Sequence, residues 1–148
     1  MGNKQYDPRM HSAEHILNQT MVRMFDCGRS SSNHLEKKKS KCDYHFNREL
    51  TEAEVQQIEN KVNEVIKSDL AIKENFITRT EAGKHFMLGR LPDDAGNTIR
   101  IISVGNYDAC PCIGQHVNST EEIGEFKIIS TSFDNDVLRI RFRLNDTE

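Results

Sequence analysis

Histidine and cysteine residues near the two ends of the chain place the strongest limit on how it can fold. His11 and His15 are four positions apart, so on a helix both rings lie on one face, about one turn from each other. Cys112 and His116 repeat this spacing far downstream, in a segment punctuated by proline and glycine. Three imidazoles and a thiolate suit zinc, so we predict that these four side chains meet around one Zn²⁺ ion. The start of the chain must then pack against a loop close to its end.

Two alternatives explain the first pair of histidines differently. The pattern His-x-x-Glu-His also occurs in inverted zinc peptidases, where the glutamate, here Glu14, is the general base. Such an enzyme needs a substrate chamber that 148 residues hardly build. The other alternative is a pair of surface histidines near a free thiol. The matching spacing of Cys112 and His116 favours the zinc site over both.

The remaining cysteines fit a reduced protein. Nothing apolar follows the first lysine as a secretory signal would require, so we expect free thiols and a cytoplasmic location. Cys27 and Cys42 are expected to pack as small hydrophobic residues. Cys110 is either a neighbour of the metal or a substitute for one of its ligands.

Length and composition favour a single globular domain over residues 1–148. Charged residues make up 29% of the chain and apolar residues 36%, as in ordinary globular proteins. No apolar run approaches the roughly 20 residues of a membrane span, so no membrane partner is expected. The net charge of −3 argues against strong non-specific binding of nucleic acid by the chain as a whole.

Two local groups of basic residues are candidate contacts for RNA phosphates. One is the run Lys37, Lys38 and Lys39. The other is the set Arg139, Arg141 and Arg143, which alternates with apolar residues and so belongs on one face of a strand. A solvated sheet face that carries three charges explains this second group equally well.

Hydrophobic periodicity predicts two helices and several strands. Helices are expected at residues 8–25 and 52–68, and strands at 41–46, 71–78, 98–104, 126–133 and 137–144. Asp7 is the predicted cap of the first helix and Gly28 its left-handed terminus, while Thr51 and Glu54 form a capping box for the second. Asn135 marks a turn between the last two strands. These elements predict an α+β domain with two main helices packed on a largely antiparallel sheet.

Several of these segments together resemble the editing domain shared by alanyl- and threonyl-tRNA synthetases. They are the histidine pair on the first helix, residues 58–63 of the second, the segment RIISVGNYDACPCIGQHV at 100–117 and IGEFKI at 123–128. The chain most resembles the short free-standing AlaX-type trans-editing proteins of this family. The resemblance implies a synthetase editing-domain-like fold.

The resemblance also implies an activity, namely hydrolysis of the ester between a wrong amino acid and the 3′ end of tRNA. The substrate would be alanine tRNA mischarged with Ser or Gly, held by its aminoacylated acceptor end. His11, His15, Cys112 and His116 would bind zinc, and a zinc-bound water would attack, with no side-chain base assigned. The family's usual Cys-Gly-Gly-Thr-His loop is altered here, because Ile113 and Gln115 replace the first glycine and the threonine.

Recognition of a substrate hydroxyl needs polar groups near the metal. Ser30, Ser31, Ser32 and Gln115 are the candidates, because a buried polar group left unpaired by the wrong substrate costs about 1–3 kcal/mol. Two other functions fit the same residues. One is a zinc-stabilised tRNA-binding module without catalysis, and the other is a metal hydrolase of small esters or amides.

Overall fold

A computed structural model describes residues 7–36, 38–85, 98–112 and 114–145. In chain order the elements are α1 (Pro8–Phe25), β1 (Ser32–Leu35), β2 (Ser40–His45), α2 (Glu52–Lys67), β3 (Ile72–Thr78), α3 (Arg79–His85), β4 (Thr98–Val104), β5 (Asp108–Pro111), a 3₁₀ turn η2 (Thr120–Ile123), β6 (Glu125–Asp134) and β7 (Val137–Asn145). The predicted α+β fold with antiparallel pairing is confirmed.

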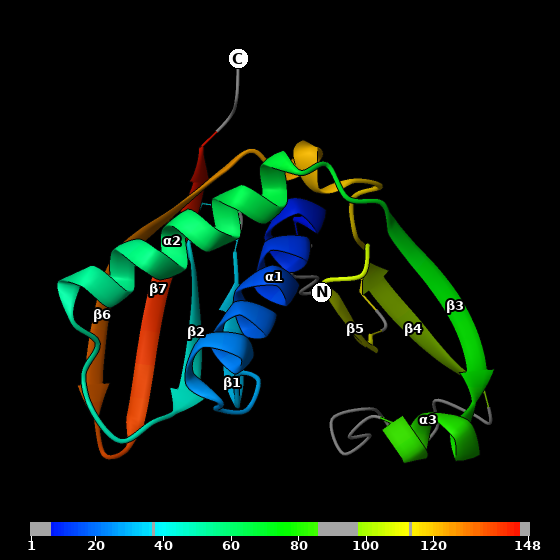
Figure 1. Ribbon diagram of the computed structural model, residues 1–148, viewed down its shortest axis with the longest axis horizontal. Helices are drawn as coiled ribbons and strands as arrows, with labels where there is room; N and C mark the ends of the chain where they lie inside the picture. Colours follow the sequence, from blue (N-terminus) through cyan, green and yellow to red (C-terminus); the bar gives the residue numbers. More distant parts are fainter. Residues whose placement is uncertain (1–6, 37, 86–97, 113, 146–148) are drawn as a thin grey trace, which may run out of the picture.

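The strands form two antiparallel sheets where the sequence indicated one. The first sheet has the order β1-β2-β7-β6 and the second has the order β3-β4-β5. Helix α1 lies between the two sheets, and α2 crosses one face of the four-stranded sheet (Figure 1). α1 is therefore placed to connect the two halves of the domain.

The ends of both long helices show why they form where they do. The side chain of Asp7 accepts a hydrogen bond from the backbone N–H of Arg9, and Thr51 and Glu54 form the predicted capping box. The prediction for Gly28 is wrong. The helix ends at Phe25, and Asp26 takes the left-handed conformation with φ 55°, which a short polar side chain tolerates.

The main core lies between α1, α2 and the four-stranded sheet. α1 buries its apolar stripe, which includes Met10, Ala13, Leu17 and Met21. α2 adds its own buried stripe, and the inward residues of β7 complete the cluster with Leu138, Ile140 and Phe142. The alternation predicted for β7 is thus confirmed. Asn135 and Asp136, both at positive φ, form the tight turn between β6 and β7.

The three-stranded sheet carries a smaller core on the face that α3 covers. Ala82 of α3 packs against Ile99 and Ile101 of β4. The opposite face of this sheet is turned toward α1, because Cys110 of β5 contacts His15 of α1. That second face carries the candidate metal ligand Cys112, which contacts His11 of α1. Within the described residues, no helix has the length and apolar character needed to cross a membrane.

Candidate metal centre

Helix α1 positions two histidines on the side that faces the three-stranded sheet. Met10, Ala13 and Leu17 anchor the helix to the core, so His11 and His15 project from a fixed support. His15 is only 2% exposed, whereas His11 is partly accessible. The helix therefore presents one buried and one accessible imidazole.

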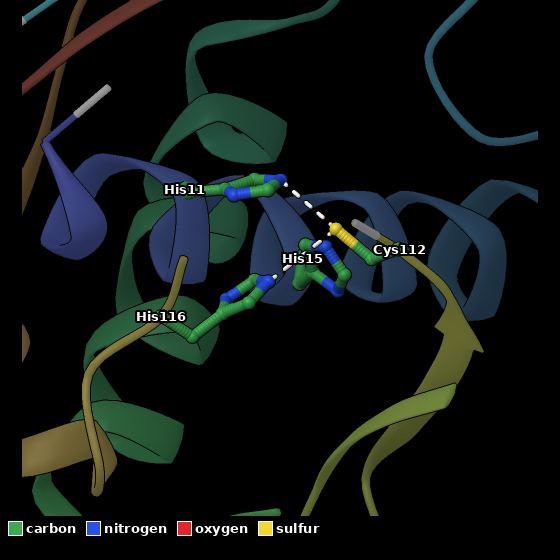
Figure 2. A group of neighbouring side chains, drawn as sticks. All are labelled: His11, His15, Cys112 and His116. Atoms are coloured by element: carbon green, nitrogen blue, oxygen red, sulfur yellow. Dashed lines mark hydrogen bonds between the residues drawn. The ribbon is translucent and has the colours of Figure 1, made fainter. Parts of the chain in front are cut away.

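The four predicted ligands converge, as Figure 2 shows. The Sγ atom of Cys112 lies 3.2 Å from Nε2 of His11 and 3.4 Å from Nε2 of His116. One ligand atom from each of His11, His15, Cys112 and His116 lies within 4.8 Å of every other. Neighbouring ligand atoms in a tetrahedral zinc site are about 3.3–3.8 Å apart, and a set of imidazoles with one thiolate suits this metal. The residue types of the cluster therefore suit such an ion, and the four ligand atoms are close enough to one another that they could share one.

The outer nitrogens of two of these rings have oxygen partners. Nδ1 of His11 lies 3.2 Å from the carbonyl oxygen of Gln115, and Nδ1 of His116 lies 3.0 Å from the hydroxyl of Ser12. The same hydroxyl accepts a hydrogen bond from the backbone N–H of Val117. Such contacts fix the orientation of a ligating ring, so the Nε2 atoms of His11 and His116 are kept facing the sulfur of Cys112.

His15 is held by a second set of buried groups. Its Nδ1 atom lies 3.3 Å from Sγ of Cys110 and 3.6 Å from a carboxylate oxygen of Asp108. Arg29 donates two hydrogen bonds to that carboxylate, at 2.7 and 3.2 Å, and Gln19 donates a third at 2.8 Å. Asp108 is thus fixed by its neighbours and in turn fixes His15. The sequence indicated none of these contacts, because they depend on how β5 meets α1.

The charges in the cluster favour the metal-binding forms of Cys112 and His116, whereas they favour the protonated form of His15, which must lose its proton to bind a metal. Burial alone would raise the pKa of the Cys112 thiol, but hydrogen bonds with His11, His116 and His15 lower it to about 3. Burial lowers the pKa of His116. Burial opposes charge on His15, yet Asp108 and the two cysteines outweigh it and raise the pKa of this ring. The lowered pKa favours the thiolate form of Cys112, which is the form that binds metal.

A buried polar network adjoins His15. The carboxylate of Glu14 accepts hydrogen bonds from the side chains of Asn18, Ser30 and Asn33. Asn18 in turn accepts hydrogen bonds from the hydroxyl of Tyr44 and the backbone N–H of Ser30. The network connects the segment before β1 to the ligand helix.

The predicted substrate residues separate into two groups. Ser30 is buried in the network of Glu14, whereas Ser31 and Ser32 are exposed, and the hydroxyl of Ser31 donates to the carbonyl oxygen of Asp43. Ser32 begins strand β1. Gln115 is exposed and contributes its backbone oxygen to His11.

The predicted RNA contacts lie apart from the ligand cluster. The side chains of β7 that point away from the core include Arg139, Arg141 and Arg143, on the sheet face opposite α1. Arg139 is paired with Asp43 at 2.7 and 2.9 Å, and Arg141 donates to Ser130. Lys38 and Lys39 are exposed between β1 and β2, and Lys37 lies outside the described residues.

Arg100 is a further residue of the site that sequence reasoning missed. Its Nη1 atom donates to the carbonyl oxygens of Cys112 at 3.2 Å and Gly114 at 2.7 Å. Its Nε atom donates to Glu74 at 2.6 Å. Arg100 therefore ties the loop that carries Cys112 to strands β3 and β4. Ile113 lies outside the described residues.

The fold and the site define an α+β domain in which a His/Cys cluster that could hold a metal ion lies between a helix and a distant loop. Residues 99–141 match the model of the threonyl and alanyl tRNA synthetase second additional domain. The chain belongs to this domain family through that segment, which confirms the resemblance seen in the sequence. The matched segment runs from β4 through Cys112 and His116 into β7.

The relatives with the most similar sequences include several alanine–tRNA ligases. The protein of Nostoc punctiforme is 34% identical over 121 residues, and that of Coxiella burnetii is 31% identical over 125 residues. The ligase of Methanopyrus kandleri is 29% identical over 141 residues. These matches cover 81%, 84% and 90% of this chain but only 14–15% of the ligases.

Proposed function

We propose that this protein hydrolyses the ester of mischarged aminoacyl-tRNA with the help of zinc. The observation that carries the proposal is the convergence of three imidazoles and a thiolate inside a domain of this family. The relatives are alanine–tRNA ligases, so the substrate we propose is alanine tRNA that carries Ser or Gly. The resemblance to short AlaX-type proteins favours action in trans.

His11, His15, Cys112 and His116 would hold the ion. Bound zinc would polarise the ester carbonyl, lower the pKa of a water molecule or bind the α-amino group of the substrate. A closed set of four protein ligands is typical of structural zinc sites, whereas a catalytic site keeps one position open. We therefore propose that one ligand position exchanges with water or substrate.

The more accessible ligands are the ones suited to that exchange. His15 is buried and held by Asp108 and Cys110, so it would stay in place. His11 and Cys112 are partly accessible, and so is His116. An incoming group would therefore approach from the side of these three residues.

Selection of the amino acid would use the polar groups beside His15. Ser30 lies in the buried network of Glu14, so a substrate hydroxyl placed there would find acceptors that are already oriented. A Ser hydroxyl could exchange for one of the hydrogen bonds within this network, whereas an alanine methyl group could form none, and a hydrogen bond of this kind contributes about 0.5–1.5 kcal/mol. Gln115, Ser31 and Ser32 are exposed and would act only on parts of the substrate near the surface.

The RNA partner would be held chiefly through phosphates. Lys38 and Lys39 lie in the β1–β2 connection, close to the start of α1, because Ser40 contacts Met10. We propose that Lys37, Lys38 and Lys39 contact the acceptor stem. Arg139, Arg141 and Arg143 lie on the opposite sheet face and would contact only a more distant part of the RNA.

Deacylation assays test the proposal. Alanine tRNA charged with Ser, Gly or Ala would be incubated with the zinc-loaded protein, and with protein treated with a chelator. Release of Ser or Gly that is faster than release of Ala, and that needs the metal, would support the proposal. Cys112→Ala should abolish turnover, whereas Cys27→Ala, which alters a thiol outside the cluster, should not.

Two other results would contradict the proposal and favour a different function. Metal-dependent melting and tRNA binding without any deacylation would indicate a non-catalytic tRNA-binding module. Equal activity on free aminoacyl esters without RNA would indicate a hydrolase of small esters.

A further inference from the structure

An exposed aromatic residue lies on strand β3, near the metal cluster. Phe76 is 60% exposed, and Ile129 of β6 is the other large hydrophobic residue that is exposed among those the structure describes. Burial of the Phe76 ring would be favourable, yet nothing within the described chain covers most of it. The position of Phe76 on the three-stranded sheet indicates which kind of ligand would cover the ring.

The strand register places Phe76 in a row with Arg100 and Cys112. Phe76 pairs with Arg100 across β3 and β4. The pairing of β4 with β5 includes Ile101 with Pro111, and the backbone N–H of Cys112 donates to the carbonyl of Arg100 at 3.2 Å. Directly paired residues point to the same face of a sheet, so the three side chains share one face. Neighbouring strands are about 4.8 Å apart, so Phe76 lies about 10 Å from β5, the strand that Cys112 directly follows.

This face is the one that carries the candidate metal ligands. Cys110 and Cys112 contact His15 and His11 of α1. The opposite face is covered by α3 through Ala82. Phe76 therefore lies on the same side of the sheet as the cluster, and β3, β4 and β5 follow one another toward α1 in Figure 1.

The side chain of Arg100 links the loop of Cys112 to strand β3, which carries Phe76. Its guanidinium binds the carbonyl oxygens of Cys112 and Gly114 and the carboxylate of Glu74. The positive charge of Arg100 is balanced by Glu74 beside Phe76, so the surface around the ring favours a neutral flat group over a phosphate. A lone aromatic ring between charged neighbours is also too small to be a protein-docking patch.

We propose that Phe76 is a stacking platform for the terminal base of a single-stranded RNA 3′ end. The inference rests on the proposed function, in which the ester on the terminal ribose lies at the metal cluster. A ribose and its base would then span the row from Cys112 to Phe76. Bases stack on exposed aromatic rings regardless of sequence, and each such contact contributes about 1–3 kcal/mol.

A fluorescent RNA tests this platform without any hydrolysis. The probe is an uncharged RNA hairpin with a single-stranded CCA end, in which 2-aminopurine replaces the terminal adenine. Wild-type protein should quench the 2-aminopurine on binding, because the base stacks on Phe76. Phe76→Ala should abolish the quenching and raise Kd by roughly 5- to 150-fold, the ratio that corresponds to one stacked base.

Two variants complete the test. Phe76→Tyr keeps a flat ring and should retain both quenching and affinity, whereas Ile129→Ala removes the other exposed apolar residue and should change neither. Unchanged quenching and Kd in Phe76→Ala would overturn the inference. Equal losses in Ile129→Ala, or no binding of the hairpin to wild-type protein, would overturn it as well.

Deacylation assays with mischarged tRNA distinguish a loss of base stacking on Phe76 from a loss of the proposed hydrolysis. Phe76→Ala should raise KM for deacylation and leave kcat close to wild type, because the ring lies away from the ester. Quenching that depends on Phe76 in a protein without deacylase activity would refute the hydrolysis and keep the platform. Normal KM in active Phe76→Ala protein would refute the platform alone.

Discussion

The Nε2 atom of His11 lies 3.2 Å from the Sγ atom of Cys112, although 101 positions separate the two residues in the sequence. The other nitrogen of His11 faces the backbone oxygen of Gln115, so the ring contacts the distant loop at both ends. Arg100 holds the same loop through the carbonyl oxygens of Cys112 and Gly114. Residues of α1 and β4 therefore both contact the loop that carries Cys112.

The close approach of Gly114 to His11 gives a first prediction. A Cβ atom at position 114 would overlap the His11 ring, so Gly114→Ala must displace either the ring or the loop. We expect zinc affinity to fall by about 10-fold or more, since ligand orientation is disturbed, with little change in the unfolding of metal-free protein. Competition with a chromophoric chelator measures the affinity.

Gly28 offers the matched control. A Cβ atom at this position meets nothing within 4 Å, so Gly28→Ala should bind zinc like the wild type. If Gly114→Ala also binds zinc with wild-type affinity, His11 is not the ligand that we propose.

Asp108 is expected to matter for both stability and metal binding. Burial would raise its pKa, but the hydrogen bond with His15 and the charge of Arg29 hold the pKa well below its usual range. Asp108→Asn leaves Arg29 without its charged partner, so the free energy of unfolding of metal-free protein should fall by roughly 2–4 kcal/mol. Zinc affinity should fall by about 10- to 100-fold, because His15 loses the group that orients it.

Urea denaturation and zinc titration measure the two effects of Asp108→Asn. Glu121→Gln alters an exposed carboxylate in η2 and should change neither quantity. Wild-type zinc affinity in a folded Asp108→Asn protein would show that His15 does not depend on this carboxylate.

The ion pair between Asp43 and Arg139 predicts a dependence of stability on pH. Hydrogen bonds from Arg139 lower the pKa of Asp43. A lowered pKa in the folded state stabilises the protein above the unfolded value of about 3.9, and this contribution is lost as the pH falls through the folded pKa. Arg139→Gln should therefore be less stable than wild type at pH 7, by less than about 1 kcal/mol, and the difference should shrink below about pH 4.

Arg141→Gln provides the comparison for this pH experiment. Arg141 donates a hydrogen bond to the hydroxyl of Ser130, which does not titrate in this range. Its replacement should therefore change the free energy of unfolding by the same amount at pH 3 and at pH 7. Thermal or urea unfolding at each pH measures both variants. A constant difference for Arg139→Gln over the same range would contradict the assignment.

Elements with strong local signals could be predicted from the sequence. α1 and α2 carry capped, amphipathic patterns, and β7 alternates regularly, so their positions follow from residue order alone. β1 and β5 could not be predicted in this way. Each has four residues and few strand-forming side chains, and each forms because a neighbouring strand, β2 or β4, supplies hydrogen-bond partners.

The candidate site likewise contains residues that local sequence signals could predict and residues that depend on contacts between strands. The spacing of His11 with His15, and of Cys112 with His116, indicated the cluster, because ligand spacing is encoded locally. The roles of Arg100, Asp108 and Phe76 depend on the register of β3, β4 and β5 and on the way β5 meets α1. Sequence periodicity does not define those relationships.

X-ray absorption at the zinc edge, on protein loaded with one equivalent of zinc, tests the proposed centre most directly. The expected first shell contains one sulfur at about 2.3 Å and nitrogen ligands at about 2.0–2.1 Å, and the sulfur should disappear in Cys112→Ala. A wild-type shell without sulfur, or a protein that binds no zinc, would contradict the assignment of His11, His15, Cys112 and His116 as the ligands of one ion.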